Sequence, residues 1–111
     1  MISLKDFFED NGERIYLIRY TLHNEEGNEE EYAEIIDHIR QTYPCSWHCL
    51  YSTWIIKTSE SVQQIFDNIS EFLDSDDALI IMELHENRFS AGRFDEALPV
   101  CLQDEILIVD L

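Results

Sequence analysis

The chain has 111 residues, of which 24 are Asp or Glu and 7 are Lys or Arg, so its formal net charge at pH 7 is −17. This charge repels DNA and RNA, attracts basic protein surfaces, and excludes a role that depends on a basic nucleic-acid-binding stripe. A hydrophobic fraction of 45% excludes disorder as the reason for the charge, and no apolar run approaches a membrane span. We expect one domain over residues 1–111 with no direct nucleic-acid or membrane contact.

The first part of the chain predicts a helix, a strand and a second helix, in that order along the sequence. Apolar side chains share one face of a short helix over 3–10, and Gly12 follows its end. Residues 14–22 are β-branched and aromatic, which predicts a strand. Apolar residues then recur at helical spacing over 29–43, with acidic residues on the opposite side, and Pro44 ends this amphipathic helix.

The middle of the chain predicts a pair of strands and another helix. Residues 46–58 have high β propensity and are long enough for two short strands that meet in a tight bend near Tyr51-Ser52. Ser61 and Gln64 have the spacing of a capping box, which predicts the start of a second amphipathic helix.

The last part of the chain begins with a run of apolar residues over 78–84, which predicts a central strand. A helical turn over 94–98 and a late strand or docking tail over 106–111 are expected in a C-terminal extension, 88–111. The element order predicts an α+β, ferredoxin-like (βαββαβ) antiparallel sheet with both helices on one face. Its core would span about 14–84, and the helix over 3–10 would be an accessory.

Three segments, Tyr16–Leu22, Trp47–Thr58 and Phe72–Leu84, resemble a family of small bacterial proteins labelled SinR-like, which is related to the CRISPR-associated protein two family. The segment Trp-His-x-Leu-x-Ser-Thr-Trp, starting at Trp47, is the most specific part. The resemblance implies a ferredoxin-like fold and a homodimer, often formed by edge-strand exchange through the C-terminal segment.

In the CRISPR-associated members, an Asp after an aromatic residue at the end of the first strand is the proposed metal-binding residue of a nuclease. Here Thr21 follows Tyr20 at that position, and threonine lacks the anionic oxygen that a hard divalent cation prefers. A metal-dependent ribonuclease or deoxyribonuclease, as in those relatives or in the virulence-associated protein D toxins, is therefore the alternative function.

Other chemistry-bearing residues favour structural roles. Three cysteines without a secretory signal predict reduced thiols in a cytoplasm. The cluster Cys45-x-x-His48-Cys49 suggests zinc, with Cys101 or His85 as a fourth ligand, but strand alternation separates His48 from Cys49 and packing is favoured. The same separation disfavours a Cys49 nucleophile. Residues expected at ordinary turn positions are His23, Asp74, Asp76 and Asp77. Trp47 and Trp54 are expected to anchor the core or a dimer interface. We expect no catalytic residue, metal ion or cofactor.

The acidic residues form one patch over a turn and a helix face, whereas the cations Arg19, Arg40, Lys57, Arg88 and Arg93 are scattered. The patch is either a solvated surface that keeps the protein soluble or an imitation of nucleic-acid phosphates. We favour a non-enzymatic homodimer that binds and inhibits or regulates a basic, nucleic-acid-binding protein partner. The predicted partner-binding residues are Glu25, Glu26, Glu30, Glu31, Glu34 and Asp37.

Overall fold

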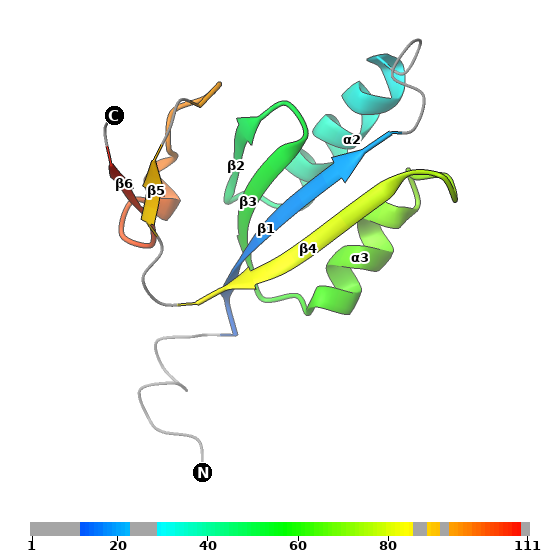
Figure 1. Cartoon of the computed structure of the whole chain (residues 1–111). Coiled ribbons are helices and arrows are strands. Elements are labelled where there is room, and N and C mark those ends of the chain that lie inside the picture. The colour runs from blue at the N-terminus through cyan, green and yellow to red at the C-terminus, as the bar shows by residue number, and fades with distance from the viewer. Residues whose placement is uncertain (1–11, 23–28, 86–88, 92–93, 110–111) are drawn as a thin grey trace.

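A computed structural model describes residues 12–22, 29–85, 89–91 and 94–109, and Figure 1 draws the other residues as a grey trace. The expected helix over 3–10 and the residues His23, Glu25 and Glu26 lie outside the described part. The described residues form an α+β structure.

Four strands form one antiparallel sheet in the order β2-β3-β1-β4. They are β1 (Arg14–Thr21), β2 (Ser46–Leu50), β3 (Thr53–Thr58) and β4 (Ala78–Leu84). Two helices, α2 (Glu29–Thr42) and α3 (Val62–Ser70), connect β1 to β2 and β3 to β4. The predicted bend within 46–58 is confirmed, because residues 51 and 52 form the turn between β2 and β3.

Both helices cover the same face of the sheet (Figure 1). Alternation along β1 turns Tyr16, Ile18 and Tyr20 toward this face, where Ile35 and Ile39 of α2 pack in the same cluster. The cluster also contains Trp54 and Ile56 of β3 with Ile65 and Ile69 of α3. The amphipathic patterns of both helices are thus satisfied against one side of the sheet.

The predicted capping box of α3 is confirmed. Ser61 Oγ accepts a hydrogen bond from the backbone N–H of Gln64 at 3.2 Å, and Gln64 Oε1 accepts one from the backbone N–H of Ser61 at 2.8 Å. These bonds satisfy two donors at the helix start that would otherwise have no intrahelical partner. Neither described helix has the length and apolar composition needed to cross a membrane.

The C-terminal part lies against the opposite face of the sheet, beside β2. It contains β5 (Phe89–Ala91), a 3₁₀ helix η1 (Val100–Leu102) and β6 (Leu107–Val109), with β5 and β6 paired in parallel (Figure 1). Leu102 and Ile106 are buried in a second hydrophobic cluster with Ile15, Trp47 and Ile55 of the sheet. The helical turn expected over 94–98 is wrong, since the only helical turn described in this part is η1.

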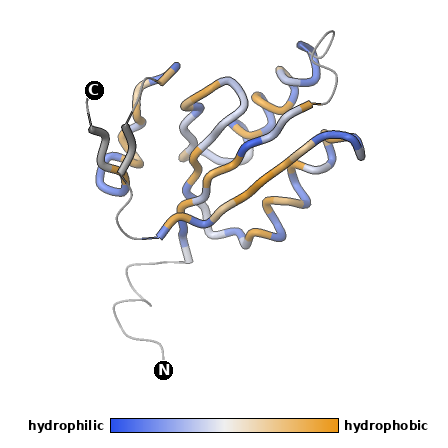
Figure 2. Tube along the Cα trace, in the orientation of Figure 1, coloured by the Kyte–Doolittle hydropathy of each residue, from blue (hydrophilic) through white to orange (hydrophobic). Residues whose placement is uncertain are grey.

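The prediction that residues 78–84 form a central strand is wrong. β4 pairs with β1 and lies at one end of the strand order. Its continuous apolar run suggested burial on both faces, but Ile80 and Met82 are 49% and 51% exposed on the face away from the helices. Figure 2 shows this hydrophobic strand at the border of the sheet.

Candidate functional site

The acidic residues of α2 lie on its solvent side. Tyr32, Ile35 and Ile39 are buried, which fixes the rotation of the helix and turns the acidic positions outward. Four predicted partner-binding residues are described and all are exposed: Glu30, Glu31, Glu34 and Asp37. The structure therefore brings these four onto one helix, and Figure 2 shows the hydrophilic start of α2.

Most described cations are paired with acids of the chain itself. Arg14 forms an ion pair with Glu83 at 3.4 Å, and Lys57 forms one with Glu105 at 3.4 Å. Arg40, near the end of α2, pairs with Glu96 of the C-terminal part. These three pairs lie away from the first two turns of α2, so they do not neutralise its acidic residues.

Arg40 and His48 border the buried ring of Trp54. The guanidinium of Arg40 lies 5.2 Å from the ring centroid of Trp54, and the ring of His48 stacks on Trp54 at 4.2 Å with an interplanar angle of 7°. A hydrogen bond of 2.7 Å joins His48 Nε2 to the backbone oxygen of Tyr51. His48 thus fixes the turn between β2 and β3.

A hollow of about 400 Å³ lies at the end of the sheet where β1 ends and α2 begins. It includes Thr21, the residue at the position where the resemblance places a metal-binding Asp. The lining residues are Arg19, Thr21, Glu29, Tyr32, Tyr51 and Ser52. The sequence does not indicate Arg19 and Tyr51 as site residues, because 32 positions separate them and only the return of β3 beside β1 brings them together.

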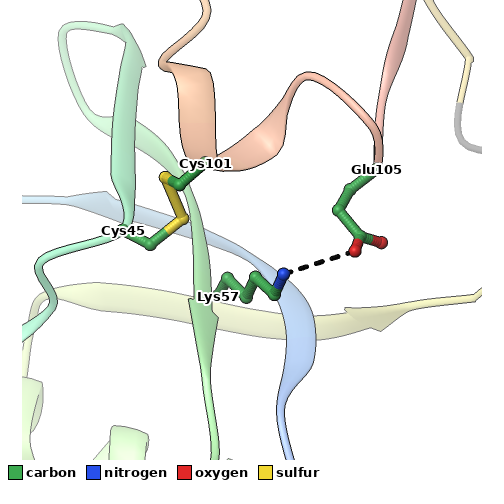
Figure 3. Close-up of a disulfide and its surroundings, with 4 residues drawn as sticks. All are labelled: Cys45, Lys57, Cys101 and Glu105. Atoms are coloured by element: carbon green, nitrogen blue, oxygen red, sulfur yellow. Dashed lines mark hydrogen bonds and ion pairs between the residues drawn. A yellow bond between two sulfur atoms is a disulfide. The ribbon is translucent and has the colours of Figure 1, made fainter. Parts of the chain in front are cut away.

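The prediction of reduced thiols is wrong for two of the three cysteines. Cys45 and Cys101 form a disulfide with a Cα–Cα distance of 6.0 Å, which ties the start of β2 to η1 (Figure 3). The neighbouring ion pair between Lys57 of β3 and Glu105, which follows η1, also joins the sheet to the C-terminal part. The odd cysteine count favoured reduced thiols, but a count does not reveal which residues approach each other in the fold.

Cys49 is buried on the face that packs against the C-terminal part. Its thiol donates a hydrogen bond to the backbone oxygen of Thr53 at 3.4 Å, and burial raises its pKa. Both features keep this sulfur protonated and disfavour a nucleophilic role.

Within the described ranges, no three His, Cys, Asp or Glu side chains gather where they could hold a metal ion. Asp77 instead closes its own turn, since its Oδ2 accepts a hydrogen bond from the backbone N–H of Asp74 at 2.8 Å. The Nε2 atom of the exposed His85 lies 3.5 Å from Oε2 of Glu83.

The chain matches no known family model, no curated protein and no solved structure. The resemblance to SinR-like proteins therefore stays a prediction.

Proposed function

We propose that the protein is a non-enzymatic, acidic interaction protein that binds a basic partner through the outward face of α2. The observation that carries this proposal is the exposure of Glu30, Glu31, Glu34 and Asp37 on one helix whose apolar side is buried. The partner would be a nucleic-acid-binding protein that the acidic face inhibits or regulates.

The density of charge on α2 supports mimicry of a polyanion. The four acidic residues of this face occupy helix positions 30–37, which span about 10 Å at the rise of an α-helix. That density, about one negative charge per 3 Å, is close to that of a single DNA strand, with one phosphate per about 3.4 Å. A groove built to bind phosphates would meet similar charge spacing on this face.

The fold proposed for this protein is ferredoxin-like. Two features support it: β1 lies between β3 and β4, and each helix connects two strands separated by one other strand. This frame holds α2 rigidly, and a rigid acidic helix binds without the cost of ordering a free segment.

Charge reversal tests the acidic face. A variant with Glu30, Glu31, Glu34 and Asp37 changed to Lys should lose salt-sensitive binding of basic nucleic-acid-binding proteins, and duplex DNA should compete with the unchanged protein for them. A matched control variant reverses four exposed acids elsewhere: Asp67, Glu71, Asp74 and Asp76.

Equal loss of binding in both variants would mean that only total charge matters, and unchanged binding by the α2 variant would refute the proposal. Metal-dependent cleavage of RNA or DNA by the purified protein would favour the alternative nuclease function instead.

We also propose that the protein is a homodimer joined through β4. In the described residues the edge at β2 is covered, since the backbone N–H of Asp95 donates to the oxygen of Cys49 at 2.9 Å. No described strand pairs with the outer edge of β4 over residues 78–83. An edge strand that has no described neighbour on one side and is largely uncharged favours pairing with another chain. An antiparallel pairing centred on Ile81 would place Ile80 opposite Met82 of the second copy.

Changing Ile80 and Met82 to Lys together places like charges opposite each other across the two-fold axis, so the dimer should dissociate in analytical ultracentrifugation. Val62 and Phe66 on α3, which are 44% and 46% exposed, provide a matched pair of Lys substitutions that should leave the dimer intact. A monomeric unchanged protein would refute this interface.

A cytoplasmic location stays a prediction. The disulfide weighs against it, because disulfides persist in oxidising compartments and are rare in a reducing cytoplasm. The number of free thiols in protein isolated from cells under alkylating conditions tests the location directly.

A further inference from the structure

The hollow at the end of β1 has an aromatic wall of two tyrosines. Tyr32 is buried, and its hydroxyl accepts a hydrogen bond from the backbone N–H of Leu22 at 3.2 Å. The ring of Tyr51 lies 4.9 Å from that of Tyr32 but is 54% exposed. Such a ring, held on one side and open to solvent, provides a surface on which a flat apolar group can stack.

The turn that carries Tyr51 is fixed by its neighbours. The backbone oxygen of Tyr51 is bonded by His48 Nε2 at 2.7 Å, and the oxygen of Ser52 accepts a hydrogen bond from the backbone N–H of Tyr20 at 3.2 Å. The aromatic wall is therefore formed before any ligand arrives, which lowers the entropic cost of binding.

Two residues of opposite charge line the same hollow without forming an ion pair with each other. Arg19 and Glu29 are both among its lining residues, and they form no ion pair within 4.0 Å. Among the described cations, Arg14, Arg40 and Lys57 have carboxylate partners, and only Arg19 has none in the described residues. An exposed arginine that has no carboxylate partner among the described residues can bind the anionic group of a ligand.

We propose that this hollow binds a free α-amino acid with an aromatic side chain. Its carboxylate would be held by Arg19, its ammonium group by Glu29, and its ring would stack on Tyr51. The hydroxyls of Thr21 and Ser52 provide further hydrogen-bonding groups at the rim. This site is independent of the proposed partner-binding face and of the proposed dimer.

The opposite charges of Arg19 and Glu29 favour a zwitterionic ligand over a nucleotide. A nucleotide phosphate would gain Arg19 but would be repelled by Glu29 and by the net charge of the chain, whereas a neutral zwitterion satisfies both groups. A volume of about 400 Å³ is at the lower end of the range for ligand pockets and suits a molecule of amino-acid size.

Titration calorimetry on the full chain tests the site with phenylalanine, tyrosine and tryptophan as probes. Phenylalaninamide lacks the carboxylate, phenylpropionate lacks the ammonium group, and alanine lacks the ring. Each should bind at least about tenfold more weakly than phenylalanine, because each loses one charge-assisted contact or the stacked ring.

Substitutions connect each ligand group to its residue. Arg19→Gln should abolish the preference for phenylalanine over phenylalaninamide, and Glu29→Gln should abolish the preference over phenylpropionate. Glu71→Gln, an exposed acid outside both the lining and the proposed partner-binding face, is the matched control and should bind like the unchanged protein.

Three results would overturn the proposal. They are no binding of the three aromatic amino acids at millimolar concentration, tighter binding of adenosine monophosphate than of phenylalanine, and preferences that persist in both variants. The measured quantity for Arg19→Gln and Glu29→Gln is the preference among ligands, so a negative result does not bear on the partner-binding proposal. Charge reversal on α2 tests that proposal separately.

Discussion

Replacing Cys101 with Ser removes the covalent connection between β2 and the C-terminal part. The disulfide joins residues 56 positions apart, and a loop of that length corresponds to about 4 kcal/mol of stability at 25 °C in the chain-entropy treatment. Cys101 is exposed, so serine creates no buried cavity there. A loss of about 4 kcal/mol is a large share of the 5–15 kcal/mol typical of folded proteins.

Urea unfolding followed by tryptophan fluorescence measures this loss, because Trp47 and Trp54 are both buried. Cys101→Ser and Cys45→Ser should lower the free energy of unfolding by similar amounts, and the double variant should lose no more than either one. Reductant should bring the unchanged protein to the level of these variants and should not affect them further.

Cys49→Ser is the matched control, since this free cysteine takes no part in the disulfide. Its absolute stability is expected to fall slightly, because a polar hydroxyl replaces a buried thiol, but its response to reductant should remain. The reasoning is refuted if the oxidised and reduced forms of the unchanged protein unfold at the same urea concentration.

Two further predictions concern the helix cap and a buried phenol. Ser61→Ala removes the side-chain cap of α3 and should cost about 1 kcal/mol in the same urea assay, whereas Ser75→Ala in an exposed turn should change stability by less than about 0.5 kcal/mol. Burial raises the pKa of Tyr20 to about 12, against the opposing hydrogen bond from Trp54, so the fold favours the neutral phenol. Its contribution, up to about 2–3 kcal/mol, is fully present below pH 10 and is lost as the pH rises through about 12. Unfolding free energies measured across this range should fall less steeply for Tyr20→Phe, and an unchanged slope would contradict the assignment.

Local patterns in the sequence predicted most of the elements correctly. The apolar spacing over 29–43 corresponds to α2, the β-branched run over 14–22 to β1, and the Ser61 capping box to the start of α3. These features depend on residues within one or two turns of each other, so side-chain periodicity and backbone capping are visible without the fold.

The position of residues 78–84 in the sheet could not be predicted from the local sequence pattern. The predicted strand has the same range as β4, Ala78–Leu84. Its apolar run, however, suggested a central position in the sheet. Position in a sheet depends on which strands pair. Ile80 and Met82 are exposed because they point away from the helices, and the described C-terminal part packs on the opposite face beside β2 and not over these two residues. An apolar sequence does not distinguish burial by the same chain from a surface left for another.

The sequence by itself determined the net charge of −17, the order of strands and helices over 14–84, and the outward acidic side of α2. Tertiary structure alone decided that Cys45 pairs with Cys101, that β4 lies at an edge, and that Arg19 and Tyr51 line one hollow. The physical reason is distance along the chain: charge and periodicity are sums over neighbouring residues, whereas these three features require segments far apart in sequence to meet when the sheet forms.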